Sequence, residues 1–572
     1  MEKITILEKA VDYRFDHFDS DLKNWPIHRL SEKRGEFVEE LNQLTIENLL
    51  RDDLDVSGIQ ELIAKTIYLE KIRMRKTPWK VDPPNEKLFW RRIEEKLTQI
   101  KTLPVELAGD KSKELLYKVV NRYSEEIVGS FKIKTFKFAR IALTIFFKIL
   151  FNRFWENMPF WGRRKALLDK IKLTGHVPQV RELMNKGTVV LLPTHSSNLD
   201  SIFIGYAIDF KAGLPSFCYG AGLNLYNSEF AAYFMNRLGA YRLDRRKKNR
   251  VYLETLKTMS RRMTTSGVNN LFFPGGTRSR SGALETKVKM GLLGTLIEAQ
   301  RKLIENGSEK KVFVVPVILS YPFVLEARVM IDEYLRNEGK EKYFKRKYKK
   351  VKRFSKLTFF NHLFSKRQTT WVSFGQPMDV LGNPVDFEGN STDVKGNSIQ
   401  VKDYFAVGEV VKRNLQRESI YTKKLSEAVL LSYKKDNVVL TAQFAAYCAF
   451  KFLERLESDK DIYDLFLLEE SDVKLPIKKF TAFSEILLER IKKLQKKEGL
   501  KLTPQFMLSI EKILHNGISE LGHYSVRKPL KLNNKKGFIS SEDVKLLYFY
   551  HNRLNVYDKQ LFAEKINFSE FI

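Results

Sequence analysis

Between about residues 166 and 380, the chain alternates short apolar runs with segments of helical periodicity. Runs rich in β-branched and aromatic residues predict strands at 188–192, 215–219, 240–243, 270–273 and 311–320. Segments between them predict helices at 201–208, 229–238, 251–265 and 291–304. Alternation of this kind is typical of an α/β domain, in which functional side chains lie in the loops after the strands.

The regions on either side of this domain have helical patterns. Residues 1–125 are highly charged and are interrupted by prolines near 78 and 83, and the chain after about 405 is again mainly helical. We therefore expect four parts: an N-terminal helical region (1–125), an amphipathic helix (126–165), the α/β domain (166–405) and a C-terminal helical region (406–572).

The segment from Phe136 to Phe154 has two distinct faces. Apolar side chains recur on one face: Phe136, Leu143, Phe147, Leu150 and Phe154, with Ile141, Ile145 and Phe146 beside them. Polar side chains recur on another: Lys137, Arg140, Thr144, Lys148 and Asn152. Flanking basic and tryptophan residues make the segment similar to helices that lie in the headgroup layer of an anionic bilayer. The same pattern also fits an ordinary helix that packs on the domain.

Neither a membrane span nor a secretory signal is expected. Charged residues interrupt the apolar stretch 136–161, whereas a spanning helix needs about 18 or more nearly uncharged apolar residues. Residues 1–20 lack the apolar stretch of a signal peptide.

The composition indicates a polyanionic partner. The 572 residues include 100 Lys and Arg against 69 Asp and Glu, which gives a formal net charge of +31. This surplus favours nucleic acid, an anionic membrane face or phosphorylated substrates as the partner. Hydrophobic residues make up 43% of the chain, which excludes a disordered protein. The two cysteines, Cys218 and Cys448, exclude a disulfide scaffold and a multi-cysteine zinc module.

The loop after the 188–192 run contains His195 and, five positions later, Asp200. A carboxylate that accepts one imidazole N–H fixes the tautomer of the ring, and the other ring nitrogen can then take a proton from an alcohol. The pair lies where functional loops gather in an α/β domain. By itself, the spacing also fits a surface histidine with Asp200 as a helix cap.

A second polar loop follows the 270–273 run. It combines two glycines and a threonine with several cations: Gly275, Gly276, Thr277, Arg278, Arg280 and Lys289. Glycines let a ligand approach the backbone closely, and arginines offer bidentate donors to a phosphate. Arg245, after the run at 240–243, adds another cation. A solvated, glycine-rich basic loop is the alternative interpretation.

The order and spacing of four blocks resemble the glycerolipid acyltransferases. The blocks are His195…Asp200, similar to the family's His-x4-Asp; Gly239…Arg245, similar to Gly-x5-Arg; Phe273…Arg278, similar to Phe-Pro-Glu-Gly-Thr-Arg; and Val315-Pro316-Val317, similar to Val-Pro-Val. Segments at 278–293, 318–326, 372–377 and 546–554 are similar to the branch that acylates glycerol 3-phosphate or dihydroxyacetone phosphate. The resemblance covers about residues 120–560 and implies an α/β acyltransferase domain, a mixed sheet flanked by helices.

The resemblance implies transfer of a fatty acyl group from acyl-CoA or an acyl carrier protein to the sn-1 hydroxyl of glycerol 3-phosphate, in phospholipid biosynthesis. By this resemblance, His195 is the general base and Asp200 orients it. The phosphate ligands are Arg245 and Arg278, followed by Arg280 and Lys289, and the main-chain oxyanion donors are Gly275, Gly276 and Thr277. Pro316 lines an acyl pocket, although it fits a core position equally well. No metal or cofactor is required, and the acyl thioester is a co-substrate. Lipid substrates favour peripheral docking of the 136–154 helix at the cytoplasmic face of an anionic membrane.

Two departures from the family pattern concern the acyl acceptor. Gly275 stands where the family has Glu, and Leu243-Asp244-Arg245 replaces the branch's Ile-Arg-Arg. An Asp-Arg pair at this place is more similar to the lysophosphatidate acyltransferases. Lysophosphatidate and dihydroxyacetone phosphate are therefore alternative acceptors.

Two non-enzymatic classes are also open at this point. The basic run Lys340–Arg353, with its interleaved aromatic residues, fits nucleic-acid binding, but no RNA-binding signature accompanies it and nucleic acid is the least favoured partner. An inactive, membrane-bound lipid-binding scaffold is the other class. The intact His195 and Asp200 favour an active enzyme instead.

Overall fold

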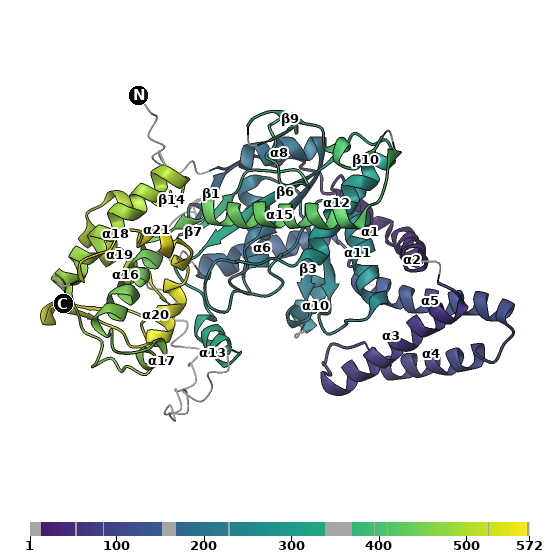
Figure 1. Ribbon diagram of the computed structural model, residues 1–572, viewed down its shortest axis with the longest axis horizontal. Helices are drawn as coiled ribbons and strands as arrows, with labels where there is room; N and C mark the ends of the chain where they lie inside the picture. The colour runs from purple at the N-terminus through teal and green to yellow at the C-terminus, as the bar shows by residue number, and fades with distance from the viewer. Residues whose placement is uncertain are drawn as a thin grey trace.

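A seven-stranded mixed sheet forms the centre of the molecule (Figure 1). The computed structural model describes residues 13–51, 54–83, 85–150, 168–226, 229–337, 369–393, 395–408, 410–523, 525–568 and 571. The strands are β1 (Ile171–Gly175), β2 (Gly187–Pro193), β3 (Cys218–Gly222), β4 (Ala240–Leu243), β5 (Asn270–Leu271), β6 (Lys311–Ser320) and β7 (Thr370–Phe374), in the order β1-β7-β6-β2-β5-β3-β4. Strands β2 to β6 run parallel to one another, whereas β7 is antiparallel to β6 and parallel to β1. The mixed sheet expected from the sequence is confirmed.

Helices cover both faces of the sheet. They are α6 (Ile133–Leu150), α8 (Val177–Lys186) and α9 (Asp200–Ala207) on one face, and α12 (Met290–Glu305) and α15 (Leu415–Lys435) on the other. The central strand β2 shows the reason for this arrangement. Val189 and Leu191 lie in the core with α6, α8 and α9, whereas Val190 and Leu192 lie in the core with α12 and α15. A strand that is apolar on both faces is buried between two layers of helices.

Most of the expected elements agree with the structure to within a few residues. The segments 188–192, 240–243, 251–265 and 311–320 correspond to β2, β4, α11 (Arg250–Thr265) and β6. The strand expected at 215–219 instead begins at Cys218, whose N–H donates to the Asn269 carbonyl at 2.9 Å. Pro215 has no N–H to donate to a neighbouring strand, so the ladder begins after it.

The N-terminal helices extend to one end of the molecule, at the right of Figure 1. They are α1 (Pro26–Glu32), α2 (Arg34–Leu50), α3 (Val56–Lys76), α4 (Glu86–Ile100) and α5 (Val105–Ile127). Helices α2 and α5 pack against α11, and α11 packs against α12. The N-terminal region therefore joins the sheet domain through α11.

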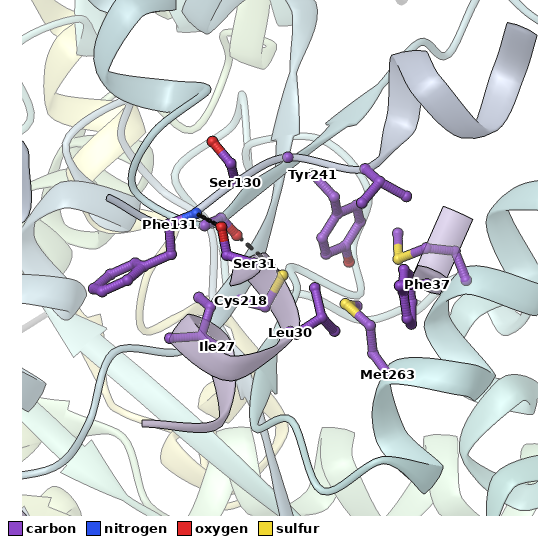
Figure 2. Close-up of a pocket in the computed structure, with 13 residues that line it drawn as sticks. Ile27, Leu30, Ser31, Phe37, Ser130, Phe131, Cys218, Tyr241 and Met263 are labelled. Carbon is purple, nitrogen blue, oxygen red and sulfur yellow. Dashed lines mark hydrogen bonds between the residues drawn. The ribbon is translucent and has the colours of Figure 1, made fainter. Parts of the chain in front are cut away.

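A small cavity lies where α1 and α11 meet the edge of the sheet (Figure 2). Its volume is ≈ 20 Å³, and the side chains around it include Ile27, Cys218 and Met263. The Cys218 thiol donates to the Gly239 carbonyl at 3.0 Å. Burial raises the pKa of Cys218 to about 12. Because the thiolate is the reactive form, this buried cysteine is a core residue and not a nucleophile.

The C-terminal helices form a separate core at the left of Figure 1. They include α16 (Thr441–Leu456), α18 (Ile477–Glu498), α19 (Ile510–Glu520) and α20 (Val544–His551). Asn552 Nδ2 donates to the Ser281 carbonyl at 2.9 Å, and the Val324 N–H donates to the Tyr550 hydroxyl at 3.1 Å. The C-terminal region therefore contacts the loops that follow β5 and β6.

Helix α6 packs on the sheet domain with its arginine turned inward. Phe147 is buried against Phe203 and Tyr206, with ring centroids 5.6 Å and 4.9 Å apart. Arg140 forms an ion pair with Asp209, in which Nε lies 2.7 Å from Oδ2. Arg140, a member of the polar stripe, therefore faces the protein, because Asp209 provides a partner for this cation there.

The opposite side of α6 exposes a second set of apolar side chains, which we call the α6 apolar patch: Phe138, Ile141, Ile145 and Phe146. Exposed Lys134 and Lys137 lie on the same helix. None of the described helices has both the length and the apolar content needed to cross a bilayer. Asn152, Phe154 and the basic run 340–353 lie outside the described residues.

Candidate functional site

The loops after β2, β4, β5 and β6 meet at one edge of the sheet because these strands run parallel. The loop after β2 carries His195, and the loop after β4 carries Arg245. Arg278 follows β5, and Glu326 follows β6. Ligand sites of α/β sheets form at this carboxyl edge, so we describe the four loops as one candidate site.

His195 and Asp200 form a hydrogen-bonded pair in which Nδ1 lies 2.9 Å from Oδ2. The carboxylate is fully buried, and the same oxygen accepts the N–H groups of Ser196 (2.6 Å) and Ser197 (2.8 Å). Asp200 is also the first residue of α9, where the helix dipole favours a negative charge. A carboxylate partner makes Nδ1 the donor and leaves Nε2 as a proton acceptor. The His195 side chain is 17% exposed, so it is not a surface histidine.

The segment 273–285 holds the main chain and the ring of His195. The His195 N–H donates to Glu285 Oε1 at 2.6 Å, and the Ser279 N–H donates to the His195 carbonyl at 2.7 Å. Phe273 stacks on the imidazole, with ring centroids 4.1 Å apart and planes inclined by 26°. These contacts fix both the position and the orientation of the proposed base.

Glu326 links the loop after β2 to the loop after β5. Its carboxylate accepts the Asn198 N–H at 2.5 Å and the Ser197 hydroxyl at 3.2 Å. Arg278 donates to the same carboxylate at 3.2 Å. The ion pair therefore holds the Arg278 guanidinium beside the His195 loop.

Arg245, Arg278 and Arg280 form a cationic cluster. Desolvation, together with the charges of Arg280 and Arg278, lowers the pKa of Arg245, which has no ion-pair partner among the described residues. Arg280 forms an ion pair of 3.1 Å with Glu333 of α13 (Ala327–Asn337). Guanidinium groups that repel one another gain stability when a phosphate or another anion binds beside them. In the described ranges, no three metal-ligating side chains come together as a metal site.

The glycine-rich turn contains the predicted oxyanion donors. Gly276 has a φ of +74°, which favours glycine, and its N–H donates to the Phe273 carbonyl at 3.0 Å. That N–H is therefore already engaged. The N–H groups of Gly275 and Thr277 have no acceptor within the described residues. Lys289 Cδ lies 2.8 Å from the place of a Cβ on Gly276, so the lysine side chain runs over this turn.

Two predicted positions lie inside the protein. Asp244 is 2% exposed, and it accepts a hydrogen bond from Arg246 Nε at 2.9 Å. Burial would raise the pKa of Asp244, but the hydrogen bonds and charge of Arg246 lower it below its usual value. Pro316 is buried within β6, where its carbonyl accepts the Gly375 N–H at 2.9 Å. An acyl-pocket role for Pro316 stays a prediction.

Arg553, in the turn after α20, is buried next to the site. Its guanidinium donates to the Leu319 carbonyl and to Asn437 Oδ1, both at 2.9 Å. Desolvation lowers the pKa of Arg553, and the charges of Glu285 and Asp200 act in the opposite direction. The C-terminal region therefore supplies a positive charge near both carboxylates.

The sequence patterns do not identify Glu285, Glu326 or Arg553 as site residues. Glu285 is an acidic residue in an otherwise basic loop, and that loop also contains the unusual Gly275. Glu326 ends the 318–326 segment, and Arg553 lies in the 546–554 segment. The family resemblance of these two segments is therefore the signal that could have identified Glu326 and Arg553. It does not indicate which loops these side chains contact.

Comparison with known proteins gives a match for the region that contains His195, Asp200, Arg245 and Arg278. Residues 170–320 match the family described as acyltransferase. A stretch of 258 residues is 26% identical to glycerol-3-phosphate acyltransferase of Pseudomonas paraeruginosa (strain DSM 24068 / PA7), and covers 45% of this chain and 27% of that protein. A stretch of 262 residues is 27% identical to the protein of the same name from Pseudomonas putida (strain GB-1), and covers 46% of this chain and 28% of the relative. The match therefore spans only about a quarter of each relative's length.

Proposed function

We propose that the chain is an acyltransferase of the glycerolipid acyltransferase family and that it transfers a fatty acyl group from an acyl thioester to the sn-1 hydroxyl of glycerol 3-phosphate. The observation that carries this proposal is the His195–Asp200 pair beside the arginine cluster. Acylation of a phosphorylated polyol needs a base for the hydroxyl and cations for the phosphate. The name of the relatives, glycerol-3-phosphate acyltransferase, supports the same acceptor.

His195 acts as the general base. Its Nε2 takes the proton of the acceptor hydroxyl while the hydroxyl oxygen attacks the thioester carbonyl carbon. The carbonyl oxygen becomes an anion in the tetrahedral intermediate, and the N–H groups of Gly275 and Thr277 are the donors for it. The C–S bond then breaks, and the leaving thiolate takes the proton from the imidazolium. Asp200 holds the tautomer and stabilises the imidazolium throughout.

The arginine cluster binds the acceptor phosphate. Arg245 and Arg278 are the first ligands, because Arg245 has no ion-pair partner in the described residues and Arg278 is held beside the His195 loop. Arg280 and Lys289 add positive charge at the margin of the same loop. The thioester is already activated, so the residues chiefly orient and deprotonate the alcohol, and no metal or cofactor is needed for this step.

Lysophosphatidate and dihydroxyacetone phosphate are the second candidate acceptors. Both compounds carry a phosphate group and a free hydroxyl group, so the same arginine cluster would bind them. The Asp244-Arg245 sequence favours lysophosphatidate by resemblance. Asp244, however, is buried and accepts a hydrogen bond from Arg246, so we do not count it among the acceptor ligands, and glycerol 3-phosphate stands first.

The proposed substrate and product are lipids, and we propose that the α6 apolar patch docks on the membrane that supplies and receives them. Its exposed apolar side chains would enter the boundary between headgroups and acyl chains, and Lys134 and Lys137 would contact anionic headgroups. The chain would then act as a peripheral protein at the cytoplasmic membrane face, in phospholipid biosynthesis. Acyl carrier protein is the partner where the donor is its thioester.

An acceptor panel tests the function directly. The purified chain is incubated with one labelled acyl thioester, as CoA or acyl carrier protein ester, and with each of the three acceptors. We expect turnover with glycerol 3-phosphate, and a loss of about 100-fold or more in His195→Ala with unchanged circular dichroism. Substantial transfer by His195→Ala would refute the mechanism, and a different preferred acceptor would refute the substrate assignment. Binding to single-stranded RNA but not to anionic vesicles would favour the nucleic-acid alternative.

A further inference from the structure

Glu285 lies in the space beside Gly275. A Cβ placed on Gly275 would lie 3.2 Å from Glu285 Cγ and 3.7 Å from Glu285 Oε1. The longer distance is about the span from Cβ to a carboxylate oxygen within one extended glutamate side chain. A glutamate at position 275 would therefore reach the place that the Glu285 carboxylate now occupies, and the two side chains exclude each other.

The carboxylate of Glu285 holds the main chain of the proposed base. It accepts the His195 N–H at 2.6 Å, which is a short, charge-assisted hydrogen bond. No other described residue accepts a hydrogen bond from this N–H. The imidazole is attached to the same residue, so a shift of the main chain here would move Nε2 relative to the acceptor hydroxyl.

The surroundings of Glu285 suit a carboxylate that is kept in place. The side chain is half-buried, and desolvation raises its pKa, whereas the hydrogen bond from the His195 N–H and the charge of Arg553 act in the opposite direction. The neighbouring contacts of His195 are of other kinds, because Ser279 binds the carbonyl and Phe273 stacks on the ring. The hydrogen bond to the N–H is therefore the contribution of Glu285 alone among the described residues.

We propose that Glu285 is a positioning residue for acyl transfer, supplied from ten positions later in the chain to the space that Gly275 leaves open. This inference rests on the proposed function and adds to it a residue that fixes the base. It also explains the departure at position 275, because a side chain there would displace the carboxylate that holds His195. Gly275 and Glu285 are then one functional pair, and exchanging their roles should preserve the site.

A swap of the two side chains tests the pair. In Glu285→Ala, we expect kcat for acyl transfer to glycerol 3-phosphate to fall about 10- to 100-fold, as for loss of a charged hydrogen bond, with the acceptor KM changed less than about twofold. Gly275→Glu should also be impaired, because two carboxylates would crowd one space. The double variant Gly275→Glu/Glu285→Ala should recover kcat to within about fivefold of the unchanged protein. Glu309→Ala, an exposed glutamate between α12 and β6, is the matched control and should leave kcat unchanged.

A second readout keeps the test independent of turnover. The rate at which diethyl pyrocarbonate modifies His195 is measured by peptide mass spectrometry on the folded full chain. Glu285→Ala should change this rate, and the double variant should restore it. If the unchanged protein transferred no acyl group to any acceptor, the proposed function would fail and the modification rates would decide the inference by themselves.

Three results would overturn the proposal. A double variant no better than Glu285→Ala in both readouts would show that the two positions are not a pair. A raised acceptor KM with unchanged kcat would make Glu285 an acceptor ligand instead of a positioning residue. Should Glu285→Ala not fold, Glu285→Gln, which keeps an acceptor oxygen, is expected to retain kcat within about tenfold of the unchanged protein, and a larger loss would count against the hydrogen bond as the cause.

Discussion

Arg246 donates a hydrogen bond to Asp82, a residue 164 positions earlier in the chain, and Nη1 lies 3.3 Å from Oδ2. The same guanidinium binds Asp244 at the end of β4 through Nε at 2.9 Å. Arg245, a proposed phosphate ligand, stands between Asp244 and Arg246 in the sequence. The N-terminal helical region therefore reaches the proposed acceptor site through the segment between α3 and α4.

Further ion pairs reinforce this junction. Arg73 of α3 is 2% exposed, and it binds Glu70 at 2.6 Å and Asp82 at 3.1 Å. Lys247, which follows Arg246, binds Glu126 of α5 at 2.5 Å. Buried pairs of this kind give geometric specificity, and removing one partner leaves a charge uncompensated. The loop 244–247 is thus held by helices from outside the sheet domain.

We expect Asp82→Asn to weaken acceptor binding more than it slows the chemical step. The neutral amide no longer compensates Arg246, so the loop that carries Arg245 would lose its fixed position. The KM for glycerol 3-phosphate should rise about tenfold while kcat falls less than about threefold. Steady-state kinetics with varied acceptor and saturating acyl thioester measure both constants.

Asp110→Asn provides the matched control, since Asp110 is an exposed aspartate on α5 away from this network. Its acceptor KM should equal that of the unchanged protein. An unaltered KM in Asp82→Asn as well would mean that the N-terminal region does not position the acceptor loop.

Arg278→Lys should raise the acceptor KM. Lysine keeps the positive charge but has no planar fork, so it cannot bind Glu326 and a phosphate in the same geometry. We expect an increase of about 10-fold or more in KM, measured with glycerol 3-phosphate, and a smaller change in Arg280→Lys, which sits in an exposed pair with Glu333. Identical KM values for the unchanged protein and Arg278→Lys would remove Arg278 from the phosphate site.

The elements that the sequence predicted correctly depend on local patterns. The strands β2 and β6 are continuous apolar runs, and the His195–Asp200 pair spans five positions within one loop. The ion pairs between Asp82 and Arg246 and between Arg278 and Glu326 join distant segments. A charged residue has many potential partners in the sequence, and only the tertiary fold selects one.

Helix α6 shows a second limit. A period of 3.6 residues separates the side chains into faces but does not decide which face meets the protein when both contain apolar residues. The decision depends on Asp209, which lies outside the helix and binds Arg140. Likewise, Glu285 occupies the space that a side chain at position 275 would fill, and this depends on a close approach of the two segments that no spacing rule describes.

Glu285 should make stability depend on pH. Burial raises the pKa of Glu285, and the hydrogen bond from the His195 N–H and the charge of Arg553 only partly oppose this. A carboxyl group with a higher pKa in the folded than in the unfolded state contributes stability below its unfolded pKa, of about 4.3, and loses it as the pH rises through its folded pKa. Glu285→Gln cannot ionise, so its unfolding midpoint should rise relative to that of the unchanged protein as the pH increases above about 4.3.

Thermal unfolding at a series of pH values measures this difference. Glu309→Gln, at an exposed site, should show the same difference at every pH. If the Glu285→Gln curve also ran parallel to that of the unchanged protein, the carboxyl group would not be the source of the pH dependence.

The α6 apolar patch should control membrane binding. Ile141 is 63% exposed and Ile145 lies one turn further along the helix, so Ile141→Glu/Ile145→Glu would place two charges where apolar side chains enter the bilayer. We expect binding to anionic phospholipid vesicles to weaken at least about tenfold, because each buried aliphatic side chain contributes about 1.5–3 kcal/mol.

Vesicle co-sedimentation measures the binding, and the control variant Leu431→Glu, at a 66% exposed site on α15, should bind normally. Arg140→Ala should instead lower the unfolding temperature, since Arg140 pairs with Asp209 on the protein side. Equal vesicle binding by the double variant and by Leu431→Glu would exclude the patch as the docking surface.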